Sequence, residues 1–345
     1  NSSSAMRTRN EPESVPAVRV ASLMRYVRHL HAAGAPVGRL LHQSGIPLVL
    51  LDHPAAAIPL TTAFRFGELA CKALGTEHLG LYVGIASMFD DLGPYGEMLQ
   101  RSLTVHEYLS NGIEFFNAMN NSQRLWLTAE GPALRFNVAT AGEQGIGSHQ
   151  ADLEVAGITI SKIREAAGQD WSPSEVNFAF RTRDTLPDID LFAGSRVSRG
   201  TGTTSFTIPR TLLRGHFPVG NGEARPLDST SLDWQPLPQD LYGLVRLQIE
   251  NLLADRGCQL DIVAETLSTS GRSLQRRLAE QGLSFAQALA ETRIHLAARE
   301  LTDTDKPVAE IGYDLGYADA SNFARAFRRQ IGMSPQSFRK AAKGT

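Results

Sequence analysis

Arginines gather in two short stretches of the C-terminal third, where their side chains could bind a polyanion. The six residues are Arg272, Arg276 and Arg277 in the first stretch and Arg325, Arg328 and Arg329 in the second. From Ala320 to Thr345 there are six Lys or Arg residues and no Asp or Glu. A guanidinium can hold guanine O6 and N7 through two hydrogen bonds, and it also binds phosphate oxygens. The two stretches therefore indicate a nucleic-acid partner.

The residues around each arginine stretch form an internal repeat, whose equivalent positions are 48 to 50 residues apart. Each copy contains a short helix, a turn, and a second helix with two large apolar residues four positions apart. These pairs are Leu274 and Leu278, and Phe323 and Phe327. Residues four apart share one helix face, so each pair must face the core. The turns "STSG" and "GYADAS" suit helix starts, with Asp319 as an expected N-cap, and the layout is that of two helix-turn-helix units.

An α-helix turns about 100° per residue, so the inward-facing pairs decide where the polar side chains point. The outward face carries Arg272, Gln275 and Arg276 in the first copy and Asn322 and Arg325 in the second, with Ala320 and Ser321 beside them. Residues further round each helix are better placed for phosphates, namely Arg277, Arg328 and Arg329. A solvated face is the usual explanation for arginines on a single helix. That alternative gives no reason for the turn and the apolar pair to occur twice.

The run from Phe285 to about Thr302 has a long helical pattern and would join the two units. Its roughly 18 residues span about 27 Å at 1.5 Å per residue. One DNA turn measures about 34 Å, so a helix of this length could hold two recognition helices on one face of the duplex. One chain is therefore expected to cover two successive major grooves.

The segment from about Gln239 to Lys343 resembles the DNA-binding domain of the AraC/XylS family of transcription regulators. The resemblance lies in "DIVAETLSTSGRSLQRRLAEQGLS" and, more specifically, in "IGYDLGYADASNFARAFRR" followed by "GMSPQSFR". It implies a regulator, expected to be an activator, with double-stranded promoter DNA and RNA polymerase as partners. The base-reading residues that it implies are Arg272, Gln275, Arg276, Ala320, Ser321, Asn322 and Arg325. Ala320 departs from the pattern, because a longer polar residue would read a base there.

The first two thirds of the chain predict a mixed α+β domain. Helical patterns cover residues 18–46 in two pieces, 61–74, 104–119 and 150–167, and strand-like runs are "RLWLTAE", "ALRFNVAT", "SEVNFAFR" and "GTTSFTIP". The segments "LGLYVGIASMFDDLGPYGEMLQRSLTVHEYL" and "SPSEVNFAF…FAGSRVSRGTGTTSFTIPRTLL" are similar to the sensor domain of regulators of the ornithine-utilisation and virulence type. That similarity implies binding of a small effector or dimerisation, but no motif names the effector or its binding residues.

One helix of this domain is a candidate homodimer face. Within residues 150–167, an apolar stripe is formed by Leu153, Ala156, Ile160 and Ile163, while Glu154 lies off it. The equally weighted alternative is that the stripe packs on the sheet of its own domain.

Composition and breaks in the pattern indicate a multi-domain protein. The expected parts are a disordered, tag-derived N-terminus (1–17), an α+β sensor and oligomerisation domain (18–219), a linker rich in proline (220–238) and an all-α domain with two helix-turn-helix units (239–345). Two distant cysteines and the lack of a long apolar run predict a reduced, cytoplasmic protein without a membrane segment. The formal net charge of −2 divides into −3 before Asp240 and +1 from there onward.

Two other classes of function are less well supported. An enzyme is disfavoured because "GIGSH" is not a nucleophile elbow and "GTGTTS" lacks the spacing of a dinucleotide loop. His29 and His31 are two residues apart on a helix, so they point to different sides and cannot share a metal. Asp90 and Asp91 adjoin a Gly-Pro turn and indicate a solvated loop. Because these residues do not form a binding site, no cofactor is expected. An architectural, sequence-blind DNA binder would need a larger positive charge. An effector-independent regulator remains an open alternative.

Overall fold

The structure is a computed structural model, and it describes residues 14–142, 144–181, 189–218, 234–253 and 258–344. The described chain forms two compact units, each with its own core. The N-terminal unit contains residues 16–237, and the C-terminal unit contains residues 238–344 together with residues 14 and 15. The predicted combination of an α+β domain and an all-α domain is therefore confirmed.

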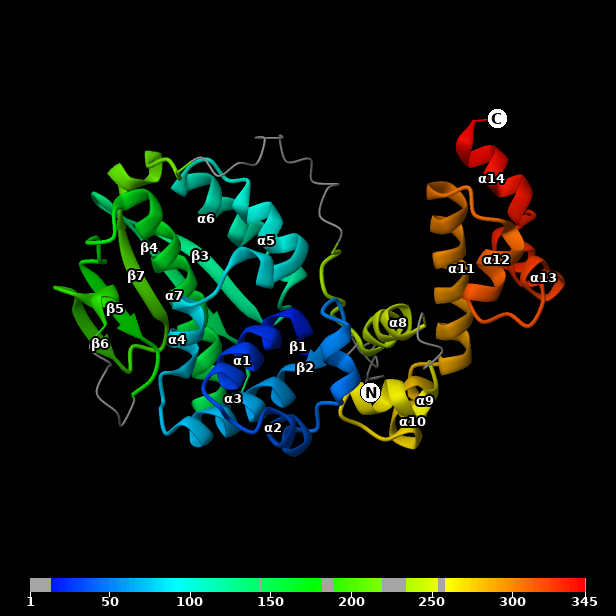
Figure 1. Ribbon diagram of the computed structural model, residues 1–345, viewed down its shortest axis with the longest axis horizontal. Helices are drawn as coiled ribbons and strands as arrows, with labels where there is room; N and C mark the ends of the chain where they lie inside the picture. The colour runs from blue at the N-terminus through cyan, green and yellow to red at the C-terminus, as the bar shows by residue number, and fades with distance from the viewer. Residues whose placement is uncertain (1–13, 143, 182–188, 219–233, 254–257, 345) are drawn as a thin grey trace, which may run out of the picture. The chain divides into compact units, whose positions relative to one another are not determined.

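The N-terminal unit contains a five-stranded mixed sheet (Figure 1). Its order is β3 (Gln123–Glu130), β4 (Ala133–Thr140), β7 (Thr204–Pro209), β5 (Glu175–Phe178) and β6 (Arg196–Arg199). All neighbours are antiparallel except β5 and β6, which are parallel. The four strand-like runs of the sequence are confirmed as β3, β4, β5 and β7, whereas β6 was not expected. A separate antiparallel pair joins β1 (Ala17–Arg19) to β2 (Ala57–Pro59).

The helices and short 3-10 turns of this unit pack in two hydrophobic clusters of described residues, of which only one includes the five-stranded sheet. The helices are α1 (Val20–Ala32), α2 (Val37–Ser44), α3 (Leu60–Leu74), α4 (Leu79–Ile85), α5 (Gly93–Gln100), α6 (Val105–Glu114) and α7 (Ile146–Ala167). The 3-10 turns are η1 (Leu48–Asp52), η2 (Phe89–Leu92), η3 (Phe116–Ala118), η4 (Asp190–Phe192) and η5 (Arg210–Arg214). The predicted helices correspond to α1, α2, α3, α6 and α7. The sequence prediction missed α4 and α5, whose glycines weaken an apolar helical pattern.

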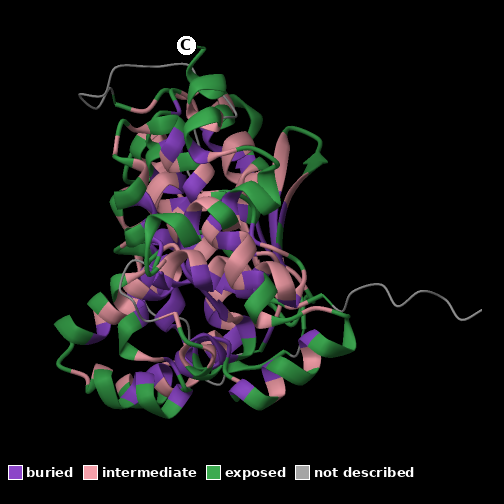
Figure 2. Ribbon diagram, turned by 90° about the vertical axis from the view of Figure 1, so that its right-hand side faces the viewer, coloured by how far each residue is buried: buried purple, intermediate pink, exposed green. Residues whose placement is uncertain are grey.

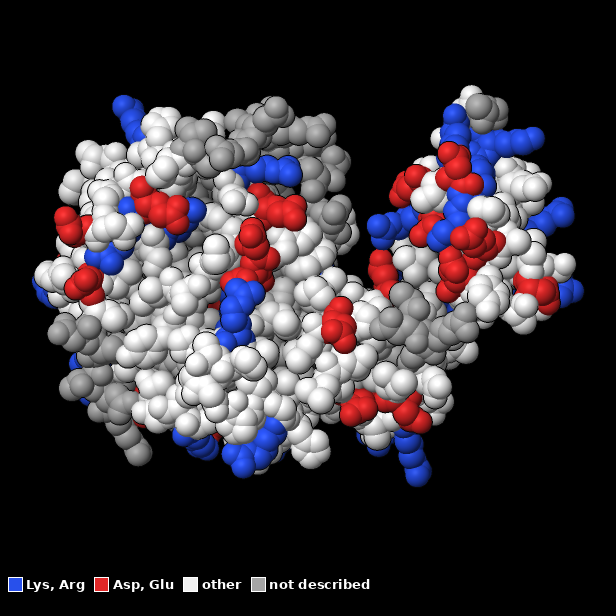
Figure 3. Space-filling view, viewed as in Figure 1, with Lys and Arg blue, Asp and Glu red and all other residues white. Residues whose placement is uncertain are grey.

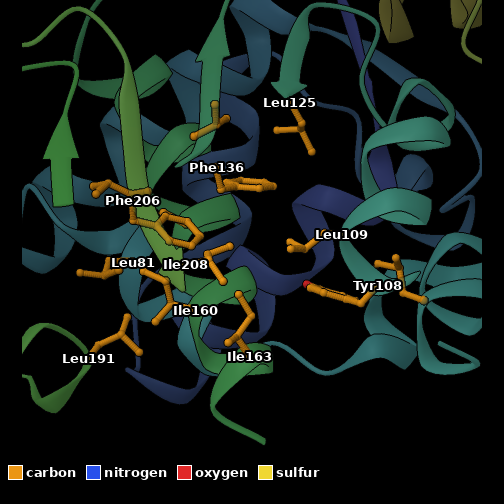
Figure 4. Close-up of a cluster of buried hydrophobic side chains, with 14 of the residues drawn as sticks. Leu81, Tyr108, Leu109, Leu125, Phe136, Ile160, Ile163, Leu191, Phe206 and Ile208 are labelled. Carbon is orange, nitrogen blue, oxygen red and sulfur yellow. The ribbon is translucent and has the colours of Figure 1, made fainter. Parts of the chain in front are cut away.

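The apolar stripe of α7 lies in the core of its own unit. Leu153, Ala156, Ile160 and Ile163 are all at most 1% exposed. Figure 4 shows Ile160 and Ile163 among side chains from the sheet, including Phe206 and Ile208. The stripe is therefore used for packing within the unit, and its candidacy as a dimer face is wrong.

Helices α4 and α7 approach each other so closely that their contact requires glycine. A Cβ atom on Gly84 would lie 2.4 Å from the carbonyl oxygen of Glu154, and one on Gly80 would lie 2.1 Å from that of Gln150. Both distances are shorter than any real contact of a Cβ atom with backbone. The two glycines, four residues apart, thus form the flat face of α4 that rests on α7.

Helices are the regular structure of the C-terminal unit in its described part, as predicted. Its helices are α8 (Leu241–Leu252), α9 (Leu260–Thr266), α10 (Gly271–Glu280), α11 (Phe285–Asp303), α12 (Val308–Asp314), α13 (Ala320–Ile331) and α14 (Pro335–Lys343). In Figure 1, α9 and α10 lie at one end of α11, and α12 to α14 lie along its other part. The pairs α9–α10 and α12–α13 are the two helix-turn-helix units. Figure 2 shows buried residues along the inner faces of the helices and exposed residues on their outer faces.

Some residues at the predicted domain borders pack on the N-terminal unit. Residues 219–233 of the expected linker lie outside the described residues, but Trp234 is packed, with the guanidinium carbon of Arg19 4.8 Å from the centre of its ring. Leu237 is buried, and its backbone N–H donates to the Asn117 carbonyl over 2.9 Å. At the start of the unit, Ala17 already belongs to β1. Among the described residues, no helix is both long and apolar enough to cross a membrane.

Candidate nucleic-acid interface

Helix α10 presents three of the predicted base-reading residues to solvent. Its N-cap is Ser270, whose hydroxyl oxygen accepts a hydrogen bond from the backbone N–H of Ser273 over 3.2 Å. Leu274 and Leu278 are fully buried, as their spacing predicted. The opposite face exposes Arg272, Gln275 and Arg276, while Arg277 is half-buried at the side.

Helix α13 follows the same plan with a larger core contact. The carboxylate of Asp319 accepts a hydrogen bond from the backbone N–H of Asn322 over 2.7 Å, so the predicted N-cap is confirmed. Phe323 and Phe327 are fully buried with ring centres 5.8 Å apart in an edge-to-face arrangement. Aromatic rings continue on both sides, with Tyr317 5.3 Å from Phe323 and Phe338 5.5 Å from Phe327. This row of rings anchors α13 to its neighbouring helices.

A glycine lets α13 lie directly on α12. A Cβ atom on Gly312 would lie 2.9 Å from three atoms of the Phe323 side chain. Any larger residue there would push α13 away from α12. The position of the second recognition helix therefore depends on Gly312, which has no side chain to contact DNA.

The exposed N-terminal end of α13 contains a chain of hydrogen bonds. The side-chain amide of Asn322 donates to the second carboxylate oxygen of Asp319 over 2.6 Å, and the Arg325 guanidinium donates to the Asn322 side-chain oxygen. Ala320 and Ser321 stand exposed at the same end. Arg325 is therefore oriented through Asn322, and either residue must exchange one of these bonds to contact a base.

The arginines of both helices keep their charge available. Arg276 has only a 3.7 Å ion pair with Glu280 on its own helix, and such exposed pairs contribute little. Within the described residues, no ion pair involves Arg272, Arg277, Arg328 or Arg329. Figure 3 shows acidic residues among the basic ones on the visible face of this unit, not one continuous basic surface. That mixture fits the small net charge of the segment.

The two recognition helices are separated by α11. It has 19 residues, which corresponds to about 28 Å at 1.5 Å per residue. Its N-cap Ser284, whose hydroxyl accepts from the Gln287 N–H over 3.2 Å, lies four residues after the end of α10. The structure thus separates the residues of the first and second copies, as expected for readers of different grooves.

The N-terminal unit contains a polar feature that the sequence prediction missed. Glu154, expected off the apolar stripe of α7, is buried and forms an ion pair with Arg25 of α1 beside a cavity. Asp91, expected to be solvated, has a side chain that is only 5% exposed and forms an ion pair with Arg28. The only signal in the sequence was a charged residue within an apolar helical pattern, which does not identify its partner.

Comparisons with known proteins cover both units. A family model described as a helix-turn-helix domain matches residues 263–341. A second, described as the arabinose-binding domain of AraC transcription regulators, matches residues 34–217, more than half of the chain.

Curated relatives carry names that agree with these matches. The HTH-type transcriptional regulator VirS of Mycobacterium tuberculosis is 25% identical over 335 residues, covering 93% of this chain and 96% of VirS. The ornithine utilization regulator of Pseudomonas aeruginosa is 45% identical over 82 residues, which is 24% of each chain. The regulatory protein SoxS of Escherichia coli is 32% identical over 106 residues, covering 30% of this chain and 94% of SoxS. The chain therefore belongs to the AraC family of transcription regulators and is itself a DNA-binding transcription regulator.

Proposed function

We propose that the protein activates transcription by placing α10 and α13 in two successive major grooves of promoter DNA. The observation that carries this proposal is the repeated arrangement of a capped recognition helix with a buried apolar pair and exposed arginines. The length of α11, about 28 Å, is close to the 34 Å of one DNA turn. A rigid helix between two such units favours binding on one face of the duplex.

The roles of the exposed residues follow from their chemistry. Arg272, Arg276 and Arg325 would bind guanine edges, and Gln275 and Asn322 would bind adenine edges. Ser321 can contact either, whereas Ala320 offers only a methyl group, which fits the methyl of thymine. Phosphate contacts are assigned to the residues further round each helix, namely Arg277, Arg328 and Arg329.

The test compares single arginine variants of the full chain on a binding site selected from randomised DNA. Arg276→Ala and Arg325→Ala should each weaken binding by about 1–3 kcal/mol and relax the base preference at one position. The two positions should lie about one DNA turn apart. Arg328→Ala should weaken binding to all sequences equally and reduce the slope of log affinity against log salt by about 1.

The matched control is Arg299→Ala, since Arg299 lies on α11 and pairs with Glu250 on α8 over 3.1 Å. It should leave affinity and base preference unchanged. An equal loss for Arg276→Ala on the selected site and on random DNA would show that Arg276 does not read a base.

We also propose that the working form is a homodimer whose N-terminal unit binds a small effector and that RNA polymerase is the partner in activation. The domain description of the matching family model supports the effector. The net charge of −2 favours a tethered pair, because linking two weak DNA-binding units raises their effective concentration. Light scattering of the full chain tests the dimer, and transcription in vitro with RNA polymerase tests activation.

The alternatives of an architectural or effector-independent DNA binder are tested in the same assays. An architectural binder would lose the selected site to an excess of unrelated DNA. An effector-independent regulator would activate transcription without any added small molecule. We infer a regulator without catalytic activity, acting in the cytoplasm where promoter DNA is located, and the regulatory names of the relatives support this.

A further inference from the structure

The N-terminal unit contains a partly open cavity of about 110 Å³ between α1, α3, α5, α6, α7 and the strands β3 and β4. Most of its wall is apolar or aromatic, including Leu23, Phe64, Leu109, Phe116 and Phe136. An apolar cavity of about 150 Å³ in another protein holds one benzene molecule. The cavity here is smaller but partly open, so one molecule the size of a six-membered ring with a short substituent fits it if one end lies in the opening.

One charged pair interrupts this apolar wall. Arg25 extends from α1 and Glu154 from α7, and a terminal nitrogen of Arg25 contacts a carboxylate oxygen of Glu154. Their side chains are only 6% and 7% exposed. The pair thus lies inside the unit, where an ionic group is stable only if its charge is balanced and its hydrogen bonds are made.

The hydrogen bonds of Arg25 are only partly made. Within the described protein, Nε and Nη1 of Arg25 have no hydrogen-bond acceptor, although both are shielded from solvent. A guanidinium has five N–H donors, and a buried donor without an acceptor costs free energy. An oxygen atom of a ligand in the cavity would accept from these donors and remove that cost.

The charge balance of the pair decides what kind of oxygen fits. Glu154 already neutralises Arg25, so a second carboxylate would put two negative charges beside one guanidinium. Desolvation raises the pKa of Glu154, although Arg25 opposes this rise, so another buried anion would be unfavourable. A cation would lack any acceptor for the Arg25 donors and would face a positive group. An uncharged oxygen atom adds no negative charge and still accepts hydrogen bonds from Arg25.

The apolar wall also argues against a sugar. Each hydroxyl of a buried pentose needs a hydrogen-bond partner, and hydroxyls placed against aromatic and aliphatic side chains would lose their bonds to water. Beside Glu154, the Tyr26 hydroxyl donates to the Gln150 carbonyl over 3.1 Å. One polar end and an apolar body describe the complementary molecule.

We propose that this cavity is the effector site and that it binds a small molecule with an apolar body and an uncharged carbonyl oxygen, which accepts hydrogen bonds from Arg25. The proposal rests on the proposed function only in that it makes the N-terminal unit the sensor. It assigns Arg25 as the recognition group and Glu154 as the residue that selects against anions.

The experiment measures binding of matched probes to the full chain by calorimetry. The probes are cyclohexyl methyl ketone, cyclohexanecarboxylate, cyclohexylmethylamine, methylcyclohexane and L-arabinose. The ketone should bind at least about tenfold tighter than each of the others, since one well-placed hydrogen bond to a charged donor corresponds to a factor of this order. Because this comparison uses the unaltered protein, it does not depend on whether any variant folds.

Two variants then test the assigned roles. Glu154→Gln leaves Arg25 without its counter-charge, so cyclohexanecarboxylate should overtake the ketone. Arg25→Met combined with Glu154→Gln removes both charges at similar volume, and the ketone should lose its tenfold advantage over methylcyclohexane. The matched control replaces the exposed pair on α3, Lys72→Met with Glu68→Gln, and should leave all probe affinities unchanged.

Several results would overturn the proposal. They are absence of binding by every probe, a wild-type preference for the carboxylate, the amine or arabinose, equal binding of ketone and methylcyclohexane, and a ketone preference that survives in the double variant. DNA binding by the same samples is measured in parallel. A chain that binds its DNA site but fails these tests would refute the cavity assignment alone, whereas loss of sequence-specific DNA binding would refute the proposed function.

Discussion

At the scale of single residues, two groups of charged side chains differ in burial, one on α10 and α13 and one in the N-terminal unit. The arginines of α10 and α13 are exposed or half-buried and keep their donors available for DNA. The charged and polar groups of the N-terminal unit include several that are buried and bonded to specific partners, such as Arg25 and Asp152. Exposed charges can exchange partners at low cost, while buried ones affect stability and its dependence on pH.

Asp152 on α7 should make the stability of the N-terminal unit depend on pH. One of its oxygens accepts from the Thr140 hydroxyl over 2.6 Å and from the Gln123 amide over 2.9 Å. Desolvation nevertheless raises the pKa of Asp152 to about 6. Between the unfolded pKa near 4 and this value, the folded state holds a proton that the unfolded state has released. The free energy of unfolding should therefore fall as pH rises through this window and level off above it.

The variant Asp152→Asn keeps an oxygen acceptor and removes the titration. The difference in unfolding free energy between variant and wild type should change by about 2–3 kcal/mol in favour of the variant between pH 4 and pH 7. Denaturation followed by tryptophan fluorescence measures it, because Trp126, Trp171 and Trp234 all lie in the N-terminal unit. Parallel pH curves for the two proteins would contradict the assignment.

At the scale of elements, the position of α13 depends on aromatic packing. Phe323 and Phe327 face Tyr317 and Phe338, and Gly312 brings α12 into direct contact with the Phe323 side chain. The predicted base-reading residues of α13 are thus positioned by the packing of Phe323 and Phe327, which are fully buried. Loss of DNA binding in a variant of this core would report displacement of the helix.

Phe327→Ala should destabilise the second helix-turn-helix unit by about 3–5 kcal/mol, because it removes a fully buried ring from a small core. The described C-terminal unit contains no tryptophan, so hydrogen exchange measured on peptides from α12 to α14 is the suitable observable. Protection should fall there and remain unchanged in α7. Arg328→Ala on the same helix is the control and should keep full protection; unchanged exchange in Phe327→Ala would mean that the ring does not support the unit.

At the scale of the whole molecule, the protein combines an α+β unit, proposed to be a sensor, with a helical DNA-binding unit, and its net charge is small. A formal charge of −2 gives weak general attraction to DNA, so we expect affinity to depend on base contacts and on the proposed pairing of chains. The apolar stripe of α7 is used inside the unit, so it is not available to pair two chains. Substitutions in that stripe therefore act on folding first.

Ile160→Asp should unfold the N-terminal unit instead of separating two folded chains. It would place an unpaired carboxylate in a fully buried position, at a cost of about 4 kcal/mol or more. Near-ultraviolet circular dichroism of the full chain should lose its tryptophan signal, while Glu165→Ala, at an exposed position of the same helix, should retain it. A folded monomer with wild-type thermal stability would instead restore the stripe as an interface.

Local features of the fold were determined by the sequence alone. The spacing of Leu274, Leu278, Phe323 and Phe327 predicted both recognition helices and their buried faces, and Asp319 was recognised as a cap. Four strands and most helices of the N-terminal unit were predicted in the same way, from the spacing of their apolar residues. Helix and strand periods, caps and turns involve residues within a few positions of each other, so their signals are contiguous in the sequence.

Only the tertiary structure decided the features made by distant residues. Arg25 and Glu154 are 129 positions apart, and nothing local indicates that they meet beside one cavity. The parallel pairing of β6 with β5, the glycine contact of α4 with α7 and the burial of the α7 stripe also depend on which elements become neighbours. A local pattern shows that a face is apolar, but the partner that covers it is set by packing of the whole unit, because hydrophobic attraction has no direction of its own.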